Sequence, residues 1–193
     1  SEELQTAVNL WISDNATALA TYGEINTWDV SLITNMYELF RDKTTFNDDI
    51  SSWDVSSVTT MSSMFKFASS FNQDLSNWDV SSVVNFRGML ESNTTFNGNI
   101  SSWNVSSEAD MTYMFAYASS FNQDIGGWDV SNVTSMKEMF KSATSFNQDL
   151  SGWDVSGVTN MFGMFFNTRS FNQALSGWDV SIVTNMNLSL IPL

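Results

Sequence analysis

The sequence contains neither cysteine nor histidine among its 193 residues. Without cysteine, the chain has no disulfide, no thiolate zinc site and no cysteine nucleophile. Without histidine, every catalytic triad that needs an imidazole base is excluded. These two absences remove many of the common catalytic and metal-binding arrangements.

Basic residues are also scarce. Seven lysines and arginines stand against 21 aspartates and glutamates, which gives a net charge of −14. Such a surface repels phosphate backbones and anionic lipids, so we expect no nucleic-acid partner. No apolar run approaches the roughly 18 residues of a transmembrane helix, so we expect no membrane insertion. Cations, basic proteins and neutral glycans remain as partners.

Large apolar side chains, by contrast, are abundant. The chain has 15 phenylalanines, eight tryptophans and 11 methionines, and 42% of its residues are hydrophobic. A disordered chain would contain few such residues. At this length the composition predicts one folded domain, or at most two, with a sizeable core.

A repeat organises the chain. One unit, residues 53–77, reads W-D-V-S-S-V-T-T-M-S-S-M-F-K-F-A-S-S-F-N-Q-D-L-S-N. Repeats of 20–50 residues are typical of stacked units that are stable only against their neighbours. The tryptophan of the unit recurs every 25 residues without insertion or deletion, at Trp28, Trp53, Trp78, Trp103, Trp128, Trp153 and Trp178.

Two spacings alternate within each unit. Around Trp78 the pattern L-x-x-W-x-V indicates a short strand, and it overlays the strand signature of leucine-rich repeats. The next apolar residues follow spacings of three, three, one and three, which is typical of one face of a short helix; in residues 53–77 they are Val58, Met61, Met64, Phe65 and Ala68. The predicted fold class is therefore an α/β solenoid: a leucine-rich-repeat-like, right-handed coil stack with one short parallel strand and one short helix per repeat.

Three regions follow from this pattern. Residues 1–25 are expected to form an N-terminal helical cap, with an amphipathic helix over residues 2–13. Residues 26–186 are the tandem repeats of a single solenoid domain. Residues 187–193 form a C-terminal tail where the repeat breaks off, so the last coil has an irregular cap or none.

Stacking would turn each position of the repeat into a column. Tryptophan, valine, methionine and phenylalanine are expected to form inward columns that make the core. An unbroken asparagine column is expected to bond the backbone of the next coil through both ends of the amide; it comprises Asn47, Asn72, Asn97, Asn122, Asn147 and Asn172.

The residue after each tryptophan is the candidate binding position. It lies between two inward residues of the predicted strand, so it should point outward and form a row of carboxylates about 5 Å apart. We favour a structural role, in which each carboxylate accepts backbone N–H groups of the following turn. A ligand or cation site is the alternative. The candidate ligand-binding residues are Asp54, Asp79, Asn104, Asp129 and Asp154.

Metal binding is the less favoured reading of the acidic rows. A second row, formed by Asp49, Asp74, Asp124 and Asp149, runs five residues before the first along the coil. Oxygen-rich sites suit Ca²⁺, but the glycine-containing loop of a true calcium motif is missing. We therefore expect no cofactor, with Ca²⁺ as the weaker alternative.

The repeat resembles that of BspA-like leucine-rich-repeat surface proteins, which occur in bacteria, mycoplasmas and some protists. The resemblance rests on W-D-V-S-x-V-T-x-M-x-x-M-F and S-F-N-Q-D-L-S and covers residues 26–186. It implies a leucine-rich-repeat-like solenoid, an extracellular or cell-surface location, and a role in adhesion or host contact. It carries over no catalytic residue.

The leading hypothesis is a non-enzymatic surface or extracellular module that recognises a protein or glycan through its repeat surface. The alternative is a structural building block that self-assembles through its coil ends into a homo-oligomer. An ice-binding role through the interrupted threonine column is less favoured. An enzyme is the least favoured, because every pair of carboxylates recurs coil by coil, as a scaffold does and a unique site does not.

Overall fold

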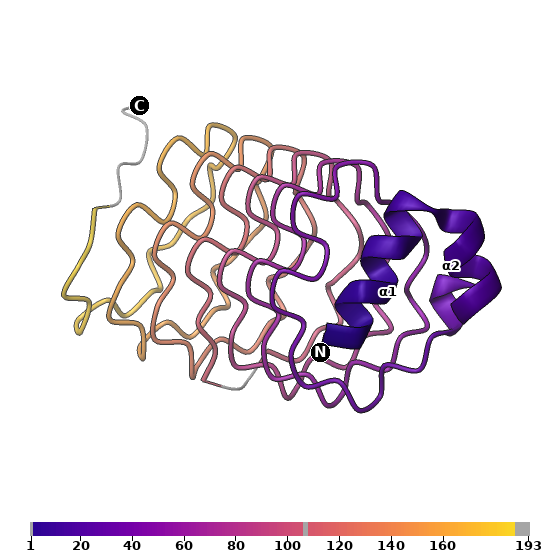
Figure 1. Ribbon diagram of the computed structural model, residues 1–193. Coiled ribbons are helices and arrows are strands. Elements are labelled where there is room, and N and C mark those ends of the chain that lie inside the picture. The colour runs from indigo at the N-terminus through magenta and orange to yellow at the C-terminus, as the bar shows by residue number, and fades with distance from the viewer. Residues whose placement is uncertain (1, 106–107, 188–193) are drawn as a thin grey trace.

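The computed structural model describes residues 2–105 and 108–187. The chain winds into a stack of coils, with helices at its N-terminal end and successive repeats displaced steadily along one axis (Figure 1). The parts of the predicted C-terminal tail beyond residue 187 lie outside the described residues.

The N-terminal end contains all of the described helical elements. Helix α1 spans Glu2–Ser13, helix α2 spans Asn15–Tyr22, and a short 3-10 helix, η1, spans Ile25–Thr27. Helix α1 confirms the helix predicted over residues 2–13. Helix α2 begins after Asp14, whose carboxylate accepts the backbone N–H of Thr17 at 3.1 Å and so caps a free donor of the first turn.

Helix α1 covers the first coil. Its apolar residues Leu4, Ala7 and Val8 are buried. The indole of Trp11 meets Trp28 edge to face, with ring centroids 5.7 Å apart, and its nitrogen donates to Asp48 at 2.8 Å. The apolar edge that a first coil would otherwise expose is therefore packed against a helix.

The predicted strand–helix composition of the repeats is wrong. Within the described repeats there is no α-helix and no strand. Each pair of neighbouring coils shares one isolated parallel bridge, such as Asn35 with Thr60 and Thr60 with Asn85. The chain is therefore not an α/β solenoid, and its repeats are not of the leucine-rich-repeat type.

The backbone explains why the predicted helix does not form. In residues 61–68, Ser63 and Phe67 adopt left-handed conformations with φ of 56° and 60°. The N–H groups of Met61, Ser63, Phe65 and Phe67 donate to carbonyls of the next coil, at distances of 2.8–3.0 Å. An α-helix would direct the same groups to carbonyls four residues earlier within the coil. Bonding between coils therefore replaces bonding along a helix.

The apolar spacing nevertheless identified the buried residues correctly. Val58, Met61, Met64, Phe65 and Ala68 are all fully buried. The tight turns of the coil place residues three and four apart on the same side, as a helix would. The prediction of an inward face was therefore right, although its secondary structure was wrong.

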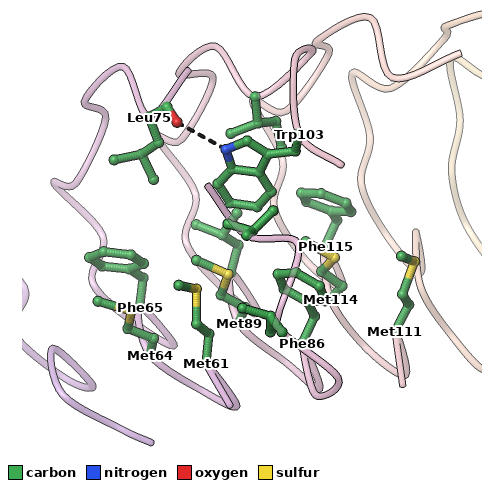
Figure 2. Packing of buried hydrophobic residues seen from close by; sticks show 14 of the residues in the cluster. Met61, Met64, Phe65, Leu75, Phe86, Met89, Trp103, Met111, Met114 and Phe115 are labelled. Carbon is green, nitrogen blue, oxygen red and sulfur yellow. Dashed lines mark hydrogen bonds between the residues drawn. The ribbon is translucent and has the colours of Figure 1, made fainter. Parts of the chain in front are cut away.

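The tryptophan column forms one wall of the core, as predicted. The tryptophans from Trp53 to Trp153 are buried, and those at the two ends are partly buried. Adjacent indoles stack, with centroids 6.2 Å apart for Trp103 and Trp128. Figure 2 shows Trp103 above the methionines and phenylalanines of neighbouring coils, with its nitrogen bonded to the Leu75 carbonyl. Stacked phenylalanines form the neighbouring columns, as between Phe46 and Phe71, whose ring centroids are 5.7 Å apart.

The asparagine column joins coils through one end of its amide. The Asn47 side-chain oxygen accepts the backbone N–H of Asn72 at 2.8 Å, and the same bond recurs up to Asn147 with Asn172. Glutamine side chains add to it, because Gln73 donates to both oxygens of Asn47. The predicted bond between coils is confirmed for the carbonyl end of the amide.

The last described coil packs less tightly than the others. Phe171, Leu175, Trp178, Val180 and Val183 are only partly buried, whereas their hydrophobic equivalents within residues 46–158 are buried. No helix in the described part of the chain has the length and apolar character needed to cross a membrane.

Candidate binding surface

One side of each coil forms what we call the turn face. It consists of residues 37–42, 62–67, 87–92, 112–117, 137–142 and 162–167. In each segment the third and fourth residues, such as Met64 and Phe65, point into the core and are buried. The other four positions are at least partly exposed in most coils and build the surface. The residues buried at these positions are Ser62, Gly88, Thr112, Ala116, Glu138 and Gly163.

Two positions in every segment of the turn face have a left-handed backbone. They are occupied by serine, glycine, asparagine or acidic residues in most coils. Three are aromatic: Phe67, Tyr113 and Tyr117 have φ of 60°, 60° and 61°. Bulky residues are rarely found at positive φ, because Cβ approaches the carbonyl oxygen there. These three aromatic residues therefore occupy a backbone conformation that is unfavourable for bulky side chains. In most other coils, the same positions are occupied by other residue types.

Most of the exposed aromatic rings of the repeats lie on the turn face. Tyr37 is 54% exposed, Phe166 is 48% exposed, and Tyr117, Phe67 and Phe162 are exposed to between 37% and 42%. Burying these rings would gain free energy, whereas leaving them in water gains none. Exposed aromatic groups gathered on one face are typical of an interaction surface.

Cations from neighbouring coils lie over these rings. The Tyr113 ring has the Arg87 guanidinium 5.3 Å from its centroid and the Lys137 ammonium at 5.5 Å, one from the preceding and one from the following coil. Lys141 lies 5.6 Å from the Tyr117 centroid and 5.9 Å from that of Phe166. Rings and cations therefore alternate from coil to coil along the stack.

Carboxylates on the same face pair with some of these cations. The Lys66 ammonium lies 2.8 Å from the Glu91 carboxylate, and Lys141 lies 2.5 Å from Glu138. The hydrogen bond with Glu138 raises the pKa of Lys141 above its usual value. Among the described residues, no carboxylate forms an ion pair with Lys137, although its ammonium lies near two rings. The turn face is thus nearly balanced in charge.

A shallow hollow lies at the C-terminal end of the turn face. Its volume is about 200 Å³, and most of its lining is apolar. Glu138 is nearly buried beside it, at 8% exposure. The hollow is lined by Glu138, Lys141, Phe162, Gly163, Phe166 and Asn187.

The predicted aspartate row lies outside the segments of the turn face in sequence and is exposed, as expected. The Asp54 carboxylate accepts the backbone N–H of Ser56 at 3.1 Å and its hydroxyl at 2.6 Å. The same backbone bond recurs at Asp79, Asp129 and Asp154. These bonds, led by the serine hydroxyl, hold the pKa of each of the four carboxyls below its usual value. The structural role favoured from the sequence therefore accounts for these side chains.

Two further sets of residues were considered from the sequence: Asn104 and the second acidic row. Asn104 is exposed and precedes residues 106–107, which lie outside the described part. In the second row, Asp74 accepts the N–H of Ser76 and Asp124 that of Gly126, at 2.8 and 3.0 Å. Within the described residues, no group of three acidic side chains converges as a metal site would require.

The turn face was not found from the sequence, although a signal was present. Tyr37, Tyr117, Phe162 and Phe166 fall at repeat positions that are not part of the apolar columns. Comparing the repeats position by position would have separated them from the core aromatics. Most basic residues of the chain fall at the same positions, which is a second signal.

A protein-family model matches the chain twice, over residues 10–125 and 100–190. No curated protein and no solved structure matches it. The family match fits the mycoplasma-type repeat expected from the sequence, but it does not identify a BspA-like leucine-rich repeat. The two matches together cover nearly the whole chain, which therefore belongs to the family described as Mycoplasma protein of unknown function, DUF285.

Proposed function

We propose that the chain is a non-enzymatic module that binds another macromolecule through its repeat surface, and that the turn face is the surface used. The observation that carries this proposal is the set of exposed aromatic residues on the turn face, two of which, Phe67 and Tyr117, also have a left-handed backbone. Tyr117 is 42% exposed and has φ of 61°, so it contributes little to the core and occupies a backbone conformation that suits a smaller residue. Outliers of this kind cluster at functional sites.

A protein partner fits the turn face better than a glycan does. Sugar rings bind aromatic side chains through the ring faces. The faces of Tyr113 are approached by Arg87 from one neighbouring coil and by Lys137 from the other. The aromatic edges and the charged groups beside them remain for contact, and these suit the mixed aromatic and polar surfaces of proteins.

The absence of catalysis is part of the same proposal. The sequence has no histidine or cysteine, so carboxylates are its main acid–base groups. The carboxylates of the Asp rows accept hydrogen bonds from residues two positions later, coil after coil. A general base needs a carboxylate that can reach a substrate proton, and these oxygens are already engaged in local turns.

A location outside the cell or on its surface is also proposed, together with a relationship to BspA-like surface proteins. The support for both is the repeat motif over residues 26–186, without the leucine-rich-repeat fold. Head-to-tail stacking of whole chains is less favoured, because helix α1 packs over the first coil through Trp11 and Trp28. A stacking partner would have to displace that helix.

The proposed function is tested with arrays of purified secreted proteins and of glycans, probed with the labelled chain. The double variant Phe162→Ser/Phe166→Ser should lose binding to any protein that the wild type retains. The matched control is Leu32→Ser/Ile182→Ser, which also removes two exposed apolar side chains, 89% and 47% exposed, but outside the turn face. Equal binding by the two double variants would refute the turn face as the binding surface.

A further inference from the structure

The charges of the chain are divided unequally between the turn face and the rest. The turn face carries five of the seven basic residues and four of the 21 acidic ones, a net charge of +1. The other two basic and 17 acidic residues leave −15 on the remainder of the chain. The basic residues of the turn face are Arg41, Lys66, Arg87, Lys137 and Lys141.

This division limits how two copies of the chain can approach each other. Any contact between their other faces brings strongly negative surfaces together, which costs free energy that grows with the product of the two charges. Contact between two turn faces reduces this cost and also buries the exposed rings of Phe67, Tyr117, Phe162 and Phe166. Electrostatics and apolar burial therefore favour the same face.

The turn face is also self-complementary. Its outward residues form two rows, one at the start and one at the end of each segment. A two-fold axis parallel to the stack places the first row of one copy against the second row of the other, coil by coil.

Arg87 then faces Glu91 of the other copy, and Phe162 faces Phe166. Tyr37 meets Arg41 in the same way, as an aromatic ring and a cation. Like charges meet in one coil only, where Lys137 of one copy faces Lys141 of the other. Glu138 lies between these two lysines in the sequence.

We propose that a second copy of this chain occupies the turn face, in a two-fold dimer whose stacks lie side by side and run in the same direction. This inference rests on the proposed binding role of the turn face and names its partner. A partner with the same coil spacing stays in register over all six segments, whereas a surface without that repeat would match only a few of them. In an isologous dimer each pair of contacts occurs twice, so both Arg87–Glu91 pairs form together.

The dimer should be weak. A single strip along one side of the stack is a small interface compared with the roughly 800 Å² per partner of stable complexes. We expect a dissociation constant on the order of 1–100 μM, so that the chain is a monomer when dilute. Added salt should tighten the dimer, because it screens the repulsion between the two net negative chains.

The decisive experiment uses charge reversal and sedimentation equilibrium. Arg87→Glu places two acidic residues opposite each other at both contacts, and Glu91→Arg places two basic ones there. Each variant alone should dimerise at least tenfold more weakly than wild type. An equimolar mixture should recover the wild-type affinity, because both contacts then join opposite charges. A wild-type chain that stays monomeric at high micromolar concentration overturns the inference, and so does a mixture that stays monomeric while wild type dimerises.

A second measurement does not depend on the charge variants, since Glu91→Arg also removes the ion pair with Lys66. Phe162→Ser/Phe166→Ser should be monomeric, and Leu32→Ser/Ile182→Ser should dimerise like wild type. Equal dimerisation of these two variants refutes the turn face as the dimer contact. A monomeric wild type that still binds an arrayed protein through Phe162 and Phe166 would disprove the dimer and leave the proposed binding function intact.

Discussion

The indole nitrogen of Trp103 donates a hydrogen bond to the backbone carbonyl of Leu75, 2.9 Å away in the preceding coil (Figure 2). The same bond recurs along the column, for example from Trp128 to Ile100 at 3.1 Å. Each tryptophan from Trp53 onward therefore packs into the core and also donates a hydrogen bond to a turn 28 residues earlier.

Replacing Trp103 separates these two contributions. Trp103→Ala should lower the free energy of unfolding by about 3–5 kcal/mol, because it opens a large cavity. Trp103→Phe keeps most of the apolar contact but leaves the Leu75 carbonyl without its indole donor, which should cost about 1–3 kcal/mol. Urea denaturation followed by circular dichroism measures both. A Trp103→Phe variant as stable as wild type would show that the hydrogen bond is irrelevant.

Replacing Tyr117 tests whether an aromatic residue at positive φ reduces the stability of the fold. Tyr117→Asn should leave stability unchanged or raise it by up to about 1 kcal/mol, because asparagine tolerates positive φ and the lost cation–aromatic contact with Lys141 is weak. Asn167 already occupies the equivalent position two coils later, with φ of 58°. The matched control, Tyr37→Asn, changes an exposed tyrosine for which no positive φ is found, and should bring no gain. A clear loss of stability in Tyr117→Asn would mean that the ring supports the fold.

The aspartate turns should determine part of the response to acid. The Ser156 hydroxyl is the main cause of the lowered pKa of Asp154. A carboxyl whose pKa is lower in the folded than in the unfolded chain stabilises the fold above its unfolded pKa, and this stabilisation is lost as the pH falls through the folded pKa. We therefore expect the aspartate turns to lose their contribution below about pH 4.

Single serine substitutions check this assignment by NMR titration. Ser156→Ala should raise the pKa of Asp154 toward its usual value. Ser151→Ala should raise the pKa of Asp149 less, because the backbone N–H of Ser151 is the main cause there and survives the substitution. Identical shifts in the two variants would contradict the leading role given to the Ser156 hydroxyl.

Cations should act on the aspartate rows by screening. Thermal melts in NaCl and in CaCl₂ of equal ionic strength should show the same modest rise in melting temperature, with EDTA having no effect of its own. Asp79→Asn should be tolerated, because Asn99 accepts the N–H of Ser101 in the same kind of turn at 3.0 Å. A rise of many degrees specific to Ca²⁺ would instead identify a metal site.

The sequence predicted which residues of the coil are buried better than it predicted the backbone conformation. Apolar spacing selected Met61, Met64 and Phe65 correctly, because burial depends on which side of the coil a residue occupies. It could not distinguish a helix from turns bonded between coils, since both bring residues three and four apart together. Gly88 and Gly163, which occupy the position of Ser63 in other coils and have positive φ, were the available sign of a left-handed backbone.

The candidate site was predicted only in part. The aspartate rows were placed correctly on the surface, and their local turns were anticipated. The turn face was missed because its exposed rings were counted with the core aromatics. Its pairing of Tyr113 with Arg87 and Lys137 depends on contacts between three coils. Such contacts become visible only after the repeats have been aligned and stacked.

The bonds between coils have a mechanical consequence. The Asn column and the backbone ladder tie each coil to its neighbours, and helix α1 shields the first coil while Trp178 in the last described coil is only partly buried. Under tension, the coils should therefore peel away one after another from the C-terminal side. Each coil that detaches releases 25 residues, or about 85 Å of extended chain. A chain pulled between two attachment points would lengthen in equal steps and absorb work at each one.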